Sequence, residues 1–150
     1  MANPFQITID CADPERLVTF WSEALGYRPQ PPPADFPNWA AYYRHIGVPE
    51  EELVDIGDGT DRIIDPEGAA PPIWFQIVPE QKVGKNRLHF DLRVSGGRAI
   101  PLEERRRRVR VRVDTLVASG ATVVREDEPE GIDHFYVVMQ DPEGNEFCVA

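Results

Sequence analysis

The order of the predicted elements constrains this chain most, because a strand, a helix and several further strands follow one another twice. Period-two alternation of apolar residues marks the strands, and spacings of three and four residues mark the helices. Strand-like segments are expected at 5–11, 39–45, 73–78, 87–94, 121–125, 134–140 and 146–149. A duplicated unit of this kind packs its helices on one side of curved sheets and leaves a concave polar face on the other. The predicted fold class is therefore α+β.

Two helices have clear sequence boundaries. The first is predicted to begin at Pro14 behind the N-cap Asp13 and to end before Gly26. Its apolar residues recur at helical spacing, so we expect one side, including Trp21, to be buried. The second is predicted from about Leu102 to Ser119, with the run of arginines at 105–112 covering its polar side.

The strand at 87–94 carries the most informative polar residue, His89, because its alternate positions are apolar. The two halves also align: 6–11 with 89–94, and 74–77 with 146–149. In this alignment four side chains point into the concave face: Gln6, Gln76, His89 and Cys148.

The length of 150 residues predicts one domain, 1–150, with a first module at about 4–80 and a second at about 86–150. Sixteen basic and twenty-six acidic residues give a net charge of −10, which repels nucleic acid and anionic membranes. Two cysteines without a secretory signal or a membrane span indicate reduced thiols and a cytoplasmic protein. We therefore expect neither nucleic acid nor a membrane as a partner.

Three motifs resemble the vicinal oxygen chelate superfamily, which includes glyoxalases, bleomycin-resistance proteins and ring-cleaving dioxygenases. They are the stretch from Asp10 to Arg16 that leads into the first helix, the strand Leu88–Leu92, and the closing run Asp141–Phe147. The run Trp74–Glu80 further resembles the glyoxalase-like subgroup. The resemblance implies two tandem βαβββ modules that form a cupped mixed sheet with the helices outside, a small-molecule ligand and a homodimer.

Carried over from this resemblance, the superfamily's four metal-ligand positions fall on Gln6, Gln76, His89 and Cys148. In glyoxalase I enzymes the equivalent residues are His or Gln, Glu, His and Glu, so both glutamates are replaced here. A glyoxalase uses a metal-held carboxylate as its base, and an amide cannot take that role. The chain is therefore not expected to be a true glyoxalase I.

Metal binding is left open by the sequence. His89 and Cys148 are good zinc ligands, whereas two glutamine oxygens are weak ones, so a metal is not required and any metal would be zinc or nickel. Asp91 and Glu146 are possible replacements for the missing carboxylates. Each lies two residues from a ligand position, about 7 Å along its strand, which is far for a shared ion.

Two functions stay open. One is a metal-dependent lyase or isomerase acting on a small oxygenated metabolite, with His89 as the catalytic residue. The other is a protein that sequesters an antibiotic without chemistry, for which the net charge of −10 favours a cationic drug. Either would use a pocket lined by Gln6, Tyr42, Trp74, Gln76, His89, Asp91, Glu146 and Cys148. The segment 46–72 is expected to be either a lid or a surface insertion with a short strand near Arg62–Ile64.

Overall fold

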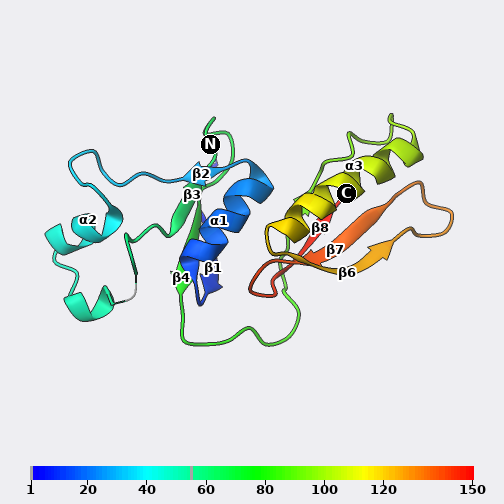
Figure 1. Cartoon of the computed structure of the whole chain (residues 1–150). Helices are drawn as coiled ribbons and strands as arrows, with labels where there is room; N and C mark the ends of the chain where they lie inside the picture. Colours follow the sequence, from blue (N-terminus) through cyan, green and yellow to red (C-terminus); the bar gives the residue numbers. More distant parts are fainter. Residues whose placement is uncertain (1, 55) are drawn as a thin grey trace. The chain divides into compact units, whose positions relative to one another are not determined.

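The computed structural model describes residues 2–54 and 56–150, which divide into two compact units. The first unit ends at Pro79, and the second is Glu80–Ala150. Each unit has its own mixed four-stranded sheet with the same connectivity, as Figure 1 shows. The predicted α+β class and the tandem arrangement of the modules are confirmed.

The sheet of the first unit has the strand order β1-β4-β3-β2. Its strands are β1 (Ile7–Cys11), β2 (Arg28–Pro29), β3 (Arg62–Ile64) and β4 (Ile73–Ile77). The pair β1 and β4 is parallel, and the other two pairs are antiparallel. Residues with buried side chains, such as Cys11 and Phe75, alternate with more exposed polar ones, such as Asp10 and Gln76. The short strand predicted near Arg62 is present as β3.

Helix α1 (Pro14–Leu25) packs on this sheet with the boundaries that the sequence predicts. The Asp13 carboxylate accepts a hydrogen bond from the Arg16 N–H at 3.1 Å, which caps the first turn. Gly26 ends the helix with φ 70°, a left-handed conformation that glycine adopts without strain. Trp21 is 2% exposed and belongs to the core, as predicted.

Residues 39–45 correct the prediction, because this segment is helix α2 (Trp39–His45) rather than a strand. The Asn38 side chain accepts a hydrogen bond from the Ala41 N–H at 2.8 Å, which supplies a helix N-cap. The aromatic residues that favoured a strand pack on one another, with the Trp39 and Tyr42 rings 5.8 Å apart. Beyond α2 the chain forms a short 3₁₀ helix, η1 (Glu50–Glu52).

The sheet of the second unit has the order β5-β8-β7-β6. Its strands are β5 (Asp91–Leu92), β6 (Thr122–Asp127), β7 (Tyr136–Gln140) and β8 (Glu146–Val149). The predicted strand 87–94 is thus mostly irregular, because the chain bends at Arg87 and Leu88 and only Asp91 and Leu92 join the ladder. His89 consequently lies just before β5, outside the regular sheet.

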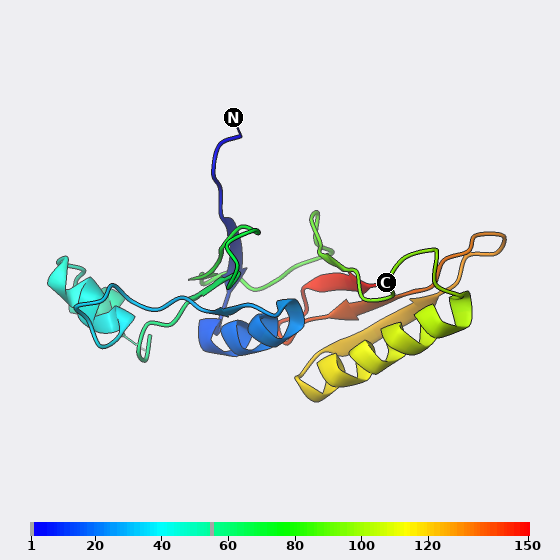
Figure 2. The ribbon, with the colours of Figure 1, turned by 90° about the horizontal axis from the view of Figure 1, so that it is seen from above.

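Helix α3 (Leu102–Ala118) lies along this second sheet, as Figure 2 shows, and buries Val109, Val113 and Leu116. The arginine run corrects the expectation of a wholly solvated face, because Arg105 is 4% exposed. Its guanidinium donates hydrogen bonds to the Ile100 carbonyl at 2.8 Å and to the Asp133 carbonyl at 3.2 Å, and it pairs with the Asp133 carboxylate. Arg106, Arg107, Arg108 and Arg110 pair with acids, as in the pair Arg107–Glu104.

The two units share a topology but differ in register by two residues. Thr8 faces Trp74 and Asp10 faces Gln76 in the first unit. In the alignment of the two halves, the equivalent of the first pair would be Asp91 facing Glu146, yet Asp91 faces Cys148. A shift of two residues keeps every side chain on its face, so the predicted polar face is preserved while its partners change.

Among the described residues, no helix is long and apolar enough to cross a membrane.

Candidate functional site

The second unit contains a hollow of about 980 Å³, here named the His89 hollow. It is lined by residues of β5, β7 and β8, by the loop that follows β5 and by Arg105 of α3. His89, Asp91 and Cys148 lie in its wall. Three of the residues selected from the sequence are therefore brought into one cavity.

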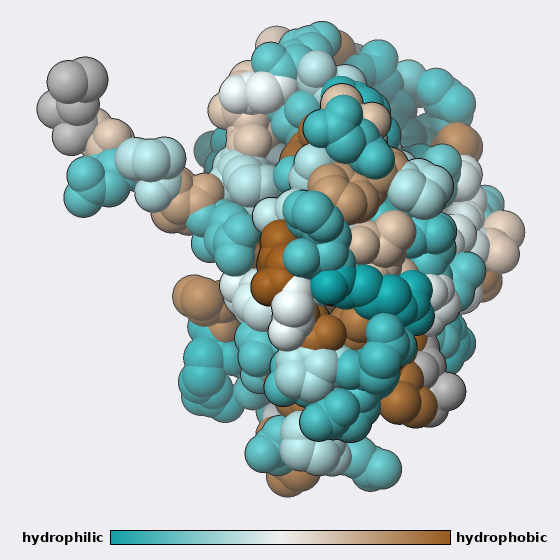
Figure 3. Space-filling model, turned by 90° about the vertical axis from the view of Figure 1, so that its left-hand side faces the viewer, coloured by the Kyte–Doolittle hydropathy of each residue, from teal (hydrophilic) through white to brown (hydrophobic). Residues whose placement is uncertain are grey.

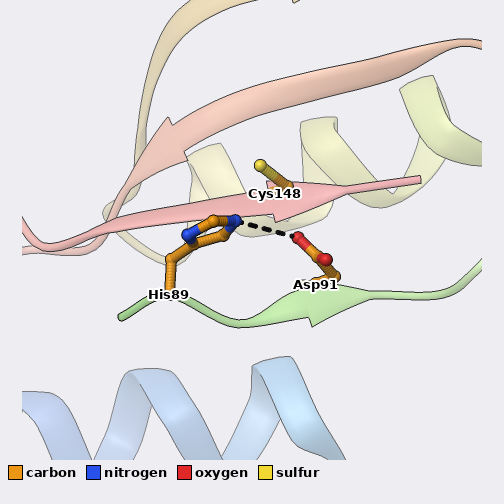
Figure 4. A group of neighbouring side chains, drawn as sticks. All are labelled: His89, Asp91 and Cys148. Atoms are coloured by element: carbon orange, nitrogen blue, oxygen red, sulfur yellow. Dashed lines mark ion pairs between the residues drawn. The ribbon is translucent and has the colours of Figure 1, made fainter. Parts of the chain in front are cut away.

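His89, Asp91 and Cys148 form a compact group of potential metal donors (Figure 4). One donor atom of each residue lies within 4.8 Å of the others. His89 Nε2 is 3.3 Å from Asp91 Oδ1, and Cys148 projects from the adjacent strand, β8. The expectation that Asp91 lies too far from His89 is wrong, because His89 precedes the regular strand and its side chain turns toward Asp91, the first residue of β5.

The thiol of Cys148 is held in its protonated form. Burial raises its pKa, and Asp91 raises it further through its charge and through a hydrogen bond with the thiol, while Arg125 and Lys85 act in the opposite direction. The His89 and Asp91 side chains are more open, with exposed fractions of 42% and 58%. The group is thus accessible to a ligand, and its thiolate form requires a cation to stabilise it.

Glu146 also lines the His89 hollow, but it is engaged elsewhere. Its carboxylate accepts a hydrogen bond from the Asn86 N–H at 3.0 Å and pairs with Lys82 at 3.2 Å. Partial burial works against ionisation, yet these contacts lower the pKa of Glu146 to about 2. Glu146 therefore fixes the segment before His89 to β8 and is not a member of the donor group.

Basic residues that the sequence analysis did not select surround the same group. Lys85, Arg93, Arg98 and Arg125 line the His89 hollow, and His134 lies there too, with its ring 5.3 Å from that of Tyr136. The signal available for Arg93 was its place in the alternation that contains His89 and Asp91. The sequence contains no comparable indication that His134 and Arg98 line this hollow.

The charge is divided unevenly along the chain. Twelve of the sixteen basic residues follow Pro79, whereas the twenty-six acidic residues are split equally, thirteen before and thirteen after that point. The face in Figure 3 is mainly hydrophilic, and the hydrophobic areas on it are small and separated. The net charge of −10 thus belongs almost wholly to the first unit and does not describe the His89 hollow.

The first unit has a hollow of its own, about 460 Å³, which contains Trp74 and Gln76 and is named the Trp74 hollow. Trp74 Nε1 donates to the Asp61 carboxylate at 2.8 Å, and Arg62 binds the same carboxylate at 3.1 Å. The Arg62 guanidinium lies 4.9 Å from the Trp39 ring centre and 5.5 Å from that of Trp74. Burial raises the pKa of Asp61, although these hydrogen bonds oppose that effect.

Gln6 and Tyr42, both predicted pocket residues, line neither of these two hollows. Gln6 precedes β1 and is exposed, and Tyr42 packs against Phe36 with ring centres 5.3 Å apart. In the parallel pair of β1 and β4, Gln76 faces Asp10, four residues beyond Gln6 and about 13 Å along the strand. The first unit therefore does not bring its two glutamines together.

An imidazole, a carboxylate and a thiol in mutual reach match the donor set of a zinc site that keeps one position open. Zinc bonds of about 2.0–2.3 Å place donor atoms about 3.3–3.8 Å apart, so the three side chains need to close by about 1 Å. A thiolate donor favours zinc over manganese.

Comparison with known proteins places this chain in a family. The model of the glyoxalase-like domain matches residues 6–150, nearly the whole chain. The chain belongs to the glyoxalase-like domain family. The duplicated topology is therefore that of a known fold. A search of curated protein sequences found no match.

Solved structures with the same fold cover almost all of this glyoxalase-like protein. A glyoxalase/bleomycin resistance/dioxygenase family enzyme from Burkholderia phytofirmans is 17% identical with a TM-score of 0.59, and the alignment covers 99% of this chain and 97% of that one. The fosfomycin resistance protein FosX from Listeria monocytogenes is 11% identical with a TM-score of 0.58, with 99% and 89% covered, and its structure holds Mn(II) and 1S,2S-dihydroxypropylphosphonic acid. At these identities the likeness establishes the fold alone.

Proposed function

We propose that this glyoxalase-like protein is a metal-dependent enzyme, a lyase or isomerase, whose active site is the His89 hollow of the second unit. The observation that carries the proposal is the donor group His89–Asp91–Cys148, with its donor atoms within 4.8 Å of one another in the wall of a large cavity. The metal bound to a FosX structure of the same fold supports the class of chemistry.

The site departs from that of a true glyoxalase I. Cys148 and Gln76 stand where the glutamates of those enzymes are expected, but Asp91 supplies a carboxylate directly opposite Cys148. A proton acceptor for carbon acid chemistry is therefore present in the hollow. Glu146 is less suited to that role, because Lys82 and Asn86 already occupy its oxygens.

Each residue of the group has a definable task. The three side chains would hold a zinc ion, which would supply Lewis-acid chemistry at a substrate oxygen. His89 would hold the metal together with Cys148, and the Asp91 carboxylate, 3.3 Å from His89 Nε2, would accept a proton from the substrate. The apolar side of β8, which includes Phe147, faces the core and holds Cys148 in place.

The metal content of the purified protein tests this proposal. We expect about one equivalent of zinc in the wild-type chain, and much less in His89→Ala, since one of three strong donors is lost. His134→Ala is the matched control, because it removes an imidazole from the same hollow but from outside the donor group. If the wild-type protein binds neither zinc nor nickel at micromolar concentration, the proposed metal-dependent activity is ruled out.

Ligand binding without chemistry is the second candidate, and the protonated state of Cys148 favours it. Burial and Asp91 both raise the pKa of this thiol, so the group is stable without a metal. A metal-free protein that still binds small molecules in the His89 hollow would support this function. The homodimer and the cytoplasmic location stay predictions from the resemblance and the sequence.

A further inference from the structure

We propose that the loop Ser95–Arg98, together with Arg93, forms an anion-binding subsite in the His89 hollow. The subsite takes the carboxylate, phosphonate or phosphoryl group of a substrate whose other end reaches the donor group. This inference deepens the proposed function by naming its substrate class, and its use in catalysis rests on that function.

Arg93 places positive charge next to the donor group. It follows His89 and Asp91 at the next alternate position, so its side chain leaves the same face about 7 Å beyond Asp91. Arg93 and Arg98 both line the hollow, and neither forms an ion pair with any residue in the described segments. In contrast, Arg125 in the same hollow is paired with Asp127 at 2.6 Å.

The loop offers backbone donors as well as charge. Gly96 and Gly97 have φ values of 88° and 86°, in the left-handed region. Gly96, Gly97 and Arg98 line the hollow. Their backbone N–H groups make no hydrogen bond within residues 2–54 and 56–150. Consecutive N–H groups in such a turn are a common way to bind an anion.

Contacts from the helix α3 hold this loop in place. Arg108 Nη1 donates to the Ser95 carbonyl at 3.3 Å, and the buried Arg105 donates to the Ile100 carbonyl at 2.8 Å. The Ser95 N–H donates to the Ala150 carbonyl at 3.1 Å, which ties the start of the loop to the end of β8. A Cβ at Gly96 would come within 2.7 Å of Arg108 Nη1, which would have to move, and the φ of 88° is one that favours glycine.

The two arginines and the backbone N–H groups of the loop together favour an oxyanion as the ligand. Guanidinium groups bind carboxylate and phosphonate oxygens through two parallel hydrogen bonds, and free N–H groups add to them. The two acidic residues that line the hollow already have partners, since Asp91 pairs with His89 and Glu146 with Lys82. The proposed subsite therefore favours an anionic ligand, in contrast to the cationic ligand that the net charge favours.

Calorimetric titration of the metal-free full-length protein with methylphosphonate and with acetate tests the subsite. We expect saturable binding of at least one probe, and the tighter probe identifies the acid group. Arg93→Gln combined with Arg98→Gln should weaken binding of the probe by about tenfold or more, because two guanidinium groups that can each donate two hydrogen bonds to the anion are lost. Arg87→Gln is the matched control, because Arg87 is exposed in the same segment but lies outside the hollow, and it should bind within about twofold of wild type.

A second variant keeps both arginines. Gly96→Ala strains a positive φ and pushes on Arg108, so it should weaken binding of the probe while the circular dichroism spectrum stays unchanged. No saturable binding to wild type, or equal binding by wild type and the double arginine variant, would overturn the subsite.

Zinc titration of the double arginine variant separates the two proposals. Unchanged zinc affinity with lost anion binding supports both. Anion binding that depends on Arg93 and Arg98 in a protein that takes no zinc supports the subsite and rejects the metal enzyme.

Discussion

Asp91 and Cys148 face each other across the parallel pair of β5 and β8, and a hydrogen bond joins the thiol to the carboxylate. The carboxylate disfavours the thiolate, and burial acts in the same direction. A divalent cation bound by both groups would offset these effects, because it would attract the carboxylate and the thiolate together. Without a metal the Cys148 thiol is therefore a weak nucleophile, whereas Asp91 and Cys148 together are suitable donors for a metal ion.

The first prediction concerns the reactivity of Cys148. Asp91→Asn removes the negative charge that raises the thiol pKa, so the pKa should fall and alkylation at pH 8 should become faster. The rate of iodoacetamide labelling, measured against pH and located by peptide mass, checks this. Glu143→Gln is a control, because it removes a charge beyond the opposite end of β8. A slower reaction in Asp91→Asn would contradict the role given to the carboxylate.

The second prediction concerns the pH dependence of zinc binding. Zinc binds the thiolate, and the pKa of Cys148 is raised, so binding at neutral pH must release the thiol proton. The wild-type affinity should therefore rise with pH by about tenfold per unit more steeply than that of Cys148→Ser. Competition with a chromophoric chelator between about pH 6.5 and pH 8 measures the slope for each protein. Equal slopes would show that Cys148 is not a ligand.

The third prediction concerns Glu146 and acid stability. Its folded-state pKa is about 2, below the ordinary value of 4.5, so ionised Glu146 stabilises the fold above about pH 4.5 and loses this effect as the pH falls toward 2. Glu146→Gln should cost about 1 kcal/mol at pH 7, after allowance for solvent screening of the Lys82 pair, and less at pH 3. Urea unfolding at the two pH values measures the difference. The exposed Glu130→Gln should show little change at either, and a constant cost for Glu146→Gln would contradict this assignment.

The sequence predicts those parts of the fold that depend on local chemistry. Asp13, Pro14 and Gly26 are sufficient to place both ends of α1, because capping and left-handed glycine are local requirements. The segment 39–45 was misassigned for a local reason as well. Its aromatic residues favour a strand, while the Asn38 cap and tertiary packing determine that it is a helix.

The candidate site was harder to predict, because it depends on register. Alternation identifies the face on which Gln76, His89 and Cys148 lie, but a slip of two residues leaves that face unchanged. The approach of Asp91 to His89, and the opposition of Asp91 and Cys148, therefore required the structure. The loop Ser95–Arg98 has no period, so its position in the hollow could not be derived from the sequence.

The last prediction compares two arginines of α3 that look alike in the sequence. Arg105 is buried and binds the carbonyls of Ile100 and Asp133, whereas Arg107 is exposed and binds Glu104. Arg105→Met leaves these carbonyls without partners and should lower the free energy of unfolding by about 2–4 kcal/mol. Arg107→Met removes a surface pair and should leave the free energy of unfolding close to that of wild type. Chemical denaturation of the two variants beside wild type gives both values. Similar small costs for the two would mean that the Arg105 contacts do not hold the loop of the proposed anion subsite, and that subsite would then lose its rigid support.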